Sequence, residues 1–123
     1  MKYSIVVLLT FLLGGCSRGV DKADLPGVYF FEGNGLRQQI TLNTNGEYLN
    51  ALYADGVLSW TETGKWSYEQ QGGKGGVTFS NFRFGLKDTA VGPGFWFVVP
   101  EKTIAGRKQL CFDIDLNRCF QAL

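Results

Sequence analysis

The sequence predicts an all-β fold, a single small antiparallel meander barrel with about 8–10 short strands in residues 25–123. Two patterns lead to this prediction. Apolar and polar residues alternate along short segments, which is the period of a strand with one buried face. Turn dipeptides recur at intervals of 8 to 11 residues, at Asn34-Gly35, Asn45-Gly46, Asp55-Gly56 and Thr63-Gly64. Asn-Gly and Asp-Gly supply the positive φ angles of tight hairpins, so this spacing indicates a meander.

The alternation is clearest in two segments. Leu36, Ile40 and Leu42 share one face of the first, and Trp66 and Tyr68 share one face of the second. Further strands are expected over Val28–Glu32, Tyr48–Tyr53, Val57–Thr61, Val77–Phe84, Phe95–Val99, Gln109–Ile114 and Arg118–Ala122. So many strands do not fit one flat sheet, and closure into a barrel also removes the exposed edges that invite aggregation.

Two local features of the second half refine this picture. The glycine-rich segment 70–76 precedes a strand rather than a helix, so it is expected to be a hairpin loop and not a phosphate-binding loop. Phe79 occupies an odd position, whereas Phe82 and Phe84 occupy even positions. Because side chains alternate between faces along a strand, this change of phase predicts a β-bulge between Phe79 and Phe82.

The first sixteen residues have the pattern of an export signal. Lys2 precedes an apolar run over 5–13, which ends in Leu13-Gly14-Gly15-Cys16. This pattern resembles the lipobox of bacterial lipoproteins, in which a peptidase cuts before a cysteine that then becomes lipidated. The resemblance implies a signal peptide over 1–15, a lipidated Cys16 carrying diacylglycerol and an acyl chain such as palmitate, and a polar tether over 16–24.

This lipoprotein interpretation also predicts a location. The apolar run of nine residues is too short for a transmembrane helix, which needs about 20. Ordinary secretion is the alternative, although its signals favour an A-x-A-like cleavage site. The protein is therefore expected in the bacterial cell envelope, bound to a membrane through Cys16. Ser17 rather than Asp after the cysteine implies the periplasmic side of the outer membrane in a Gram-negative host.

Export would also explain the two remaining cysteines, because it would allow them to form a disulfide. Cys111 and Cys119 flank a segment that is expected to form a hairpin centred near Asp115, and such a hairpin places the two cysteines opposite each other. In an oxidising compartment such a pair forms a disulfide, worth about 2.6 kcal/mol in the chain-entropy model. Two free thiols or a redox pair are the alternatives, but redox pairs more often have C-x-x-C spacing.

Short motifs in residues 25–80 resemble the lipocalin-like small barrels of bacterial lipoproteins. The motifs are Leu25-Pro26-Gly27-Val28-Tyr29, the hairpin segment 40–48, Gly64-Lys65-Trp66 and Val77-Thr78-Phe79. Tyr29 stands where the family has tryptophan. The resemblance implies a barrel that binds a ligand or a partner protein, because fold by itself does not determine function.

The composition argues against several other functions. The chain has no histidine, the commonest general base and metal ligand, and its serines lack a nucleophile elbow. The carboxylate pairs Asp113/Asp115 and Glu62/Glu69 have the features of ordinary turn and strand charges. Asp113-x-Asp115-x-Asn117 opens like a calcium loop but lacks its later glycine and glutamate. We therefore expect no enzyme activity, no metal and no cofactor.

The charges argue against nucleic acid as a partner. The chain has 12 basic and 11 acidic residues, and without Lys2 of the predicted signal the two kinds balance at 11 each. No basic stripe interrupts this balance.

Aromatic residues provide the main candidates for a binding site. The chain contains 10 Phe, 5 Tyr and 3 Trp, a heavy load for a small barrel. Core packing explains many of them, and an apolar cavity or an exposed patch is the functional alternative. Trp60, Trp66, Tyr68 and Trp96 are the residues that we expect at such a site.

Two functional hypotheses follow. In the first, the barrel of a membrane-anchored lipoprotein holds a small apolar or amphipathic ligand in its mouth, as a carrier or sensor. In the second, the domain binds another envelope protein, as an inhibitor, immunity factor or assembly subunit. An interior filled with side chains would count against the first hypothesis. A filled interior together with an exposed Phe95–Val99 edge would favour the second.

Overall fold

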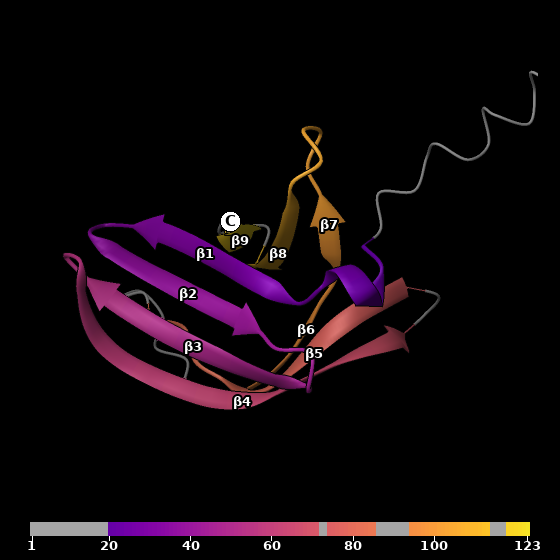
Figure 1. Ribbon diagram of the computed structural model, residues 1–123, viewed down its shortest axis with the longest axis horizontal. Helices are drawn as coiled ribbons and strands as arrows, with labels where there is room; N and C mark the ends of the chain where they lie inside the picture. The colour runs from indigo at the N-terminus through magenta and orange to yellow at the C-terminus, as the bar shows by residue number, and fades with distance from the viewer. Residues whose placement is uncertain (1–19, 72–73, 86–93, 114–117) are drawn as a thin grey trace, which may run out of the picture.

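The computed structural model describes residues 20–71, 74–85, 94–113 and 118–123. Its strands form one antiparallel sheet that curls into a nearly closed barrel, as the sequence predicted (Figure 1). The predicted signal peptide and Cys16 lie outside the described residues. No helix in the described part of the chain is long and apolar enough to cross a membrane. The elements are η1 (Lys22–Asp24), β1 (Gly27–Gly33), β2 (Leu36–Leu42), β3 (Glu47–Ala54), β4 (Val57–Gln71), β5 (Lys74–Phe82), β6 (Gly94–Val98), β7 (Pro100–Lys102), β8 (Lys108–Asp113) and β9 (Arg118–Ala122).

The sheet has the order β6-β5-β4-β3-β2-β1-β9-β8-β7. The chain itself links the two edges of the sheet, because only Val99 separates β6 from β7. β6 pairs with β5 on one side, and β7 pairs with β8 on the other. Figure 1 shows the chain rising from β6 into β7 and thus joining the two ends of the sheet. Pro100 opens β7, a position where its missing N–H costs little.

Three predicted hairpin turns are confirmed, and one of them, Asn45-Gly46, connects β2 to β3 with a φ angle of 86° at Gly46. Asn34 and Gly35 between β1 and β2 have φ angles of 53° and 76°, and Asp55 and Gly56 between β3 and β4 have 50° and 80°. Two successive positive φ angles define the turns that match the right-handed twist of the flanking strands. The tips of the β1–β2 and β3–β4 hairpins are joined, because the Asp55 N–H donates to the Gly35 carbonyl over 3.0 Å.

The predicted turn at Thr63-Gly64 is wrong. Both residues lie inside β4, which runs without interruption through the segments predicted as two strands. Gly64 pairs with Tyr48 of β3, and a Cβ atom at Gly64 would lie 2.5 Å from the Tyr48 ring. The glycine is therefore explained by the close approach of a buried aromatic ring and not by a turn.

The glycine-rich segment differs from the prediction in the same way. β4 extends to Gln71 and β5 begins at Lys74, so most of the expected loop is strand. Gly75 lies against the Tyr68 ring and Gly76 against the Phe97 ring, where a Cβ atom would collide.

The predicted β-bulge is confirmed, because the pairing of β5 with β6 shifts between Phe79 and Phe82.

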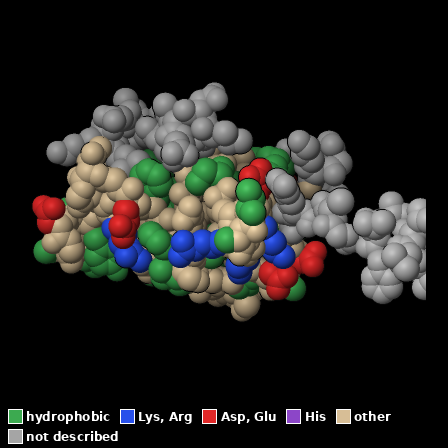
Figure 2. All heavy atoms as spheres, turned by 90° about the horizontal axis from the view of Figure 1, so that it is seen from above, with side chains coloured by type: hydrophobic (Ala, Val, Ile, Leu, Met, Phe, Trp, Pro, Cys, Tyr) green, Lys and Arg blue, Asp and Glu red, His purple; other side chains and the backbone are tan. Residues whose placement is uncertain are grey.

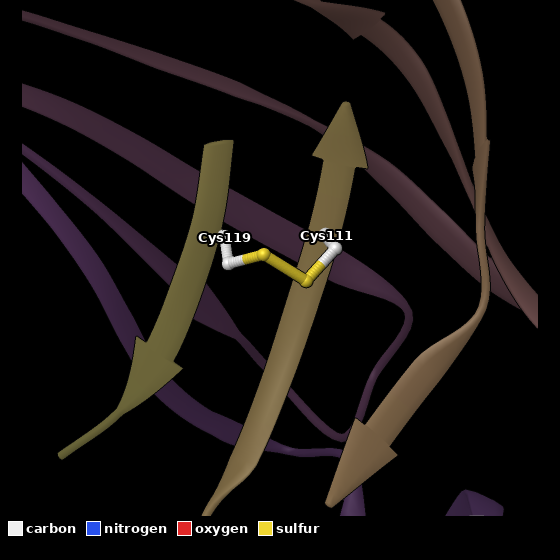
Figure 3. The surroundings of a disulfide bond; sticks show 2 residues. All are labelled: Cys111 and Cys119. Carbon is white, nitrogen blue, oxygen red and sulfur yellow. A yellow bond between two sulfur atoms is a disulfide. The ribbon is translucent and has the colours of Figure 1, made fainter. Parts of the chain in front are cut away.

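The predicted pairing of the two remaining cysteines is also confirmed. Cys111 of β8 is directly opposite Cys119 of β9, with the Cα atoms 4.0 Å apart, and a disulfide joins them (Figure 3). Leu110 and Phe120, which flank this pair in sequence, are buried, so the disulfide lies on the other face of the sheet from the core. The covalent link fixes the hairpin that completes the barrel beside β1.

Two buried amide side chains bind the segment that follows β5. Gln38 and Asn50 are fully buried and hydrogen-bonded to each other over 2.8 Å. Both donate to the Arg83 carbonyl, and the Gly85 N–H donates to Gln38 Oε1. The segment that follows β5 is thereby held against the inner faces of β2 and β3. Every one of these polar atoms has a partner, as burial requires.

The core includes two residues that precede β1. Leu25 has no exposed surface, and Val20 is 5% exposed and packs in the same cluster. The Tyr29 hydroxyl donates to the Leu25 carbonyl over 2.7 Å and ties this segment to β1.

Candidate functional site

The interior between the described strands is filled by aromatic side chains. Phe112 lies at the centre of this cluster, stacked on Phe82 with ring centroids 4.6 Å apart. Its ring also contacts those of Phe79, Phe84, Trp96 and Phe120. Interlocked rings of this kind form a packed core, in keeping with the limited interior of a small barrel.

Three of the four aromatic residues predicted for a binding site belong to this interior. Trp66 and Trp96 lie in one row across the sheet, on either side of Phe79. Trp66 is 7% exposed, and its indole N–H donates to the Asn43 carbonyl over 2.9 Å. Tyr68 and Trp96 are half-buried and pack against the core. These three residues therefore pack in or against the core, which is the alternative to a binding cavity or an exposed patch.

Trp60 lies apart from these three, further toward the start of β4, where it pairs with Leu52. The Arg83 guanidinium lies over its ring at 5.0 Å, and the same group forms an ion pair with Glu62 at 3.2 Å. The structure therefore does not bring the four predicted residues together at one site.

The segment Phe95–Val99, whose exposure would favour protein binding, is exposed only in part. Phe95 has 68% of its surface exposed, but Phe97 covers Gly76 and Val98 is buried. Single exposed apolar side chains are common on soluble proteins, so Phe95 by itself does not define a site.

A pocket of about 740 Å³ lies where the tips of the β1–β2 and β3–β4 hairpins meet. We call it the hairpin-end pocket. The described residues that line it are Glu32, Gly33, Asn34, Gly35, Leu36, Arg37, Gln39, Tyr53 and Gly56. None of the four predicted aromatic residues is among them.

The register of the strands explains how these residues come together. Glu32 of β1 pairs with Arg37 of β2, and Arg37 pairs with Tyr53 of β3. Directly paired residues share a face of the sheet, so the three side chains form a row across the strands. In β2 the residues on this face alternate with Gln38, Ile40 and Leu42, which are buried in the core. The row therefore lies on the outer face of the barrel.

The polar groups of this row are held in place by their neighbours. Arg37 Nη1 donates to Glu32 Oε1 over 3.0 Å. The same guanidinium lies over the Phe30 ring, with its central carbon 4.5 Å from the ring centroid. An arginine that is both ion-paired and stacked presents its remaining N–H groups in a defined direction.

Exposed apolar residues lie beside Tyr53, and a second hollow shares one residue with the hairpin-end pocket. Leu58 pairs with Tyr53, and Val57 and Leu58 are 69% and 52% exposed. The second hollow has a volume of about 300 Å³ and shares Glu32 with the first; Phe30, Phe31, Cys119 and Gln121 complete its lining.

Figure 2 shows one face of the molecule, on which basic and acidic side chains lie among hydrophobic ones. The described residues contain no group of three or more Cys, Asp or Glu side chains placed to hold a metal ion. Asp113, Asp115 and Asn117, the possible calcium ligands, fall at or beyond the edge of the described residues.

The sequence did contain a signal for the hairpin-end pocket. Glu32 and Arg37 flank the Asn34-Gly35 turn symmetrically, so a two-residue hairpin must place their opposite charges side by side. The position of Tyr53 beside them depends on the pairing of β2 with β3. Comparison of the chain with protein families, curated proteins and solved structures gave no match.

Proposed function

We propose that this protein is a lipid-anchored lipoprotein of the bacterial cell envelope that recognises a small amphipathic ligand in the hairpin-end pocket. The pocket itself is the observation that carries the proposal. Its volume of about 740 Å³ lies within the range of small-molecule sites, about 300–1,000 Å³. Its lining combines the aromatic ring of Tyr53 with the polar groups of Glu32, Arg37 and Gln39, which lie on the same face of the sheet.

The place of the pocket favours recognition over transport. A carrier must shield an apolar ligand from water, and the interior that would do so is occupied by aromatic rings between the described strands. A ligand in the hairpin-end pocket stays accessible from outside the barrel. Such a site suits a sensor or a recognition module.

The membrane anchor and the location rest on the lipobox pattern at Leu13-Gly14-Gly15-Cys16. The disulfide between Cys111 and Cys119 supports export, because structural disulfides persist in oxidising compartments. Both features fit the same compartment.

Native mass spectrometry of the full chain, incubated with a total extract of envelope lipids and glycans, tests the ligand proposal. We expect a bound small molecule on the wild-type protein and on the Phe95→Ala variant, but not on the Tyr53→Ala variant. Phe95 is the control because it is an exposed aromatic residue on a different strand. Binding that survives Tyr53→Ala, or no binding to any of the three proteins, contradicts the proposal.

Protein binding is the second candidate function, and a separate observation favours it. The interior is filled, whereas Val57, Leu58 and Phe95 expose apolar surface. We expect Leu58→Ser to weaken a protein complex centred on the β3–β4 hairpin, measured by crosslinking in intact cells. Ile104→Ser is the matched control, since Ile104 is fully exposed in another turn. An identical crosslinking pattern for both variants and the unchanged protein excludes that hairpin as the interface.

A further inference from the structure

The charge balance of the hairpin-end pocket restricts the ligands that it can bind. Glu32 and Arg37 are the charged side chains among the described residues that line it, and they neutralise each other at 3.0 Å. A ligand carboxylate or phosphate would have to compete with Glu32 for the Arg37 guanidinium. The pocket therefore suits an uncharged ligand better than a fatty acid or a phosphate ester.

The polar groups of the pocket offer donors and acceptors side by side. The Arg37 guanidinium carries N–H donors beyond the one bound to Glu32, and the Glu32 carboxylate keeps free acceptor positions. Their side chains remain 36% and 57% exposed, and the Gln39 amide adds a donor and an acceptor nearby. A hydroxyl group both donates and accepts hydrogen bonds, so a ligand with several hydroxyl groups matches this arrangement.

The apolar part of the pocket is short. Tyr53 is the large apolar side chain on the outer face of the sheet among its described lining residues, because Leu36 alternates with Arg37 and shares the inner face with Ile40 and Leu42. A long acyl chain needs a continuous apolar wall, which one side chain does not form. A pyranose ring needs less apolar protein surface than an acyl chain, because a single aromatic ring can pack against the C–H groups of one face of the sugar.

We infer that the hairpin-end pocket binds an uncharged carbohydrate. One face of a pyranose ring packs against Tyr53, and the hydroxyl groups bond to Arg37, Glu32 and Gln39. This inference rests on the proposed function and names the ligand class of the same site. The Phe30 ring beneath Arg37 contributes by fixing the guanidinium before the sugar arrives, which lowers the entropy cost of binding.

The test uses the full chain, purified in a detergent without a sugar headgroup. Two trisaccharides serve as probes. Chitotriose is a β-linked N-acetylated sugar and maltotriose is an α-linked glucose oligomer, so comparing them shows which of these two glycan types the pocket binds. Isothermal titration calorimetry is expected to give saturable binding of at least one trisaccharide, with a Kd of about 1 mM or tighter. Saturation-transfer NMR is expected to locate the contact on the ring protons of the sugar.

Matched variants separate stacking from hydrogen bonding. Tyr53→Ala is expected to weaken trisaccharide binding about tenfold or more, whereas Tyr53→Phe, which keeps the ring, is expected to retain most of it. Glu32→Gln removes the charge partner of Arg37, so it is expected to weaken sugar binding and to create binding of inorganic phosphate that the unchanged protein lacks. Phe95→Ala is the control for loss of an aromatic residue elsewhere.

The outcomes distinguish the two proposals. If native mass spectrometry shows Tyr53-dependent binding of a molecule from the envelope extract and neither trisaccharide binds, the carbohydrate inference fails and the proposed ligand function stands. If neither trisaccharide nor any molecule of the extract binds, both fail. Equal sugar affinity in Tyr53→Ala and the unchanged protein also overturns the inference, provided that circular dichroism shows both proteins to be folded.

Discussion

At the scale of single residues, buried polar groups are placed so that each has a partner. Tyr29 and Tyr48 are both 1% exposed, and their hydroxyl groups donate to the carbonyls of Leu25 and Ser80. Burial, with a smaller contribution from Asp24, raises the pKa of Tyr29 to about 12. Burial, with a smaller contribution from Glu62, raises the pKa of Tyr48 to about 12. These two phenols stay protonated in the folded protein at pH values that ionise them in the unfolded chain.

The raised pKa values predict a loss of stability in alkali. Between about pH 10 and 12 the unfolded tyrosines release protons while the folded ones keep them. The unfolded state then binds fewer protons, so the free energy of unfolding falls as the pH rises through this window. We expect Tyr29→Phe/Tyr48→Phe to show a shallower fall, measured by urea unfolding at several pH values. Equal slopes in the two proteins would contradict this assignment.

At the scale of strands and hairpins, three glycines are explained by the aromatic rings beside them rather than by turns. Gly64, Gly75 and Gly76 lie within β4 and β5 and leave room for Tyr48, Tyr68 and Phe97. A glycine in a strand interior weakens the strand by itself, so these contacts must compensate for the loss. The long β4 strand pairs with β3 through its first part and with β5 through its last part, and these glycines make room for the rings at both pairings.

Gly64→Ala tests this account of the β4 strand. The added methyl group would lie 2.5 Å from the Tyr48 ring, so the ring or the strand must shift. We expect a loss of about 1–3 kcal/mol in the free energy of unfolding, the usual cost of overpacking. Gly33→Ala is the matched control, because its methyl group would lie at an ordinary 3.5 Å from the Phe31 ring. Similar losses in both variants would argue against a specific role for the Tyr48 contact.

At the scale of the whole molecule, a barrel with a filled interior leaves its outer surface for recognition. The disulfide, the direct connection from β6 to β7 and the buried amides of Gln38 and Asn50 each link parts of the nearly closed barrel. The hairpin-end pocket lies on this frame, where a hydrogen bond joins the two hairpin tips that line it. A site whose lining is already held in place loses little entropy when a ligand binds.

The proposed anchor predicts a change in location. Cys16→Ala removes the sulfur that would carry the lipid, so we expect the protein to move from the membrane fraction to the soluble envelope fraction. Two or more acyl chains give stable anchoring, at about 0.8 kcal/mol for each buried CH₂ group. Membrane fractionation and intact mass measurement check this expectation. An unchanged protein with no added lipid mass, recovered in the soluble fraction, would favour ordinary secretion.

Part of the structure could be predicted because its causes are local. The positive φ angles at Asn34-Gly35 and Asp55-Gly56 follow from the residue types, and the bulge after Phe79 follows from the change of phase in the apolar pattern. The misassigned turn at Gly64 shows the limit of such reasoning. A glycine can serve either in a tight turn or in a strand packed against an aromatic ring, and the local sequence does not distinguish these two roles. At Gly64 only the contact with Tyr48, a residue of the neighbouring strand, shows which role applies.

The sequence by itself determined the all-β class, the hairpin turns and the opposition of Cys111 and Cys119, because alternation and turn chemistry act over a few residues. Only the tertiary structure decided that Trp66, Tyr68 and Trp96 pack in the interior and that Glu32, Arg37 and Tyr53 line a pocket outside it. The reason is physical. Which face of a strand is enclosed, and which side chains meet across several strands, depends on how the whole sheet curls and closes.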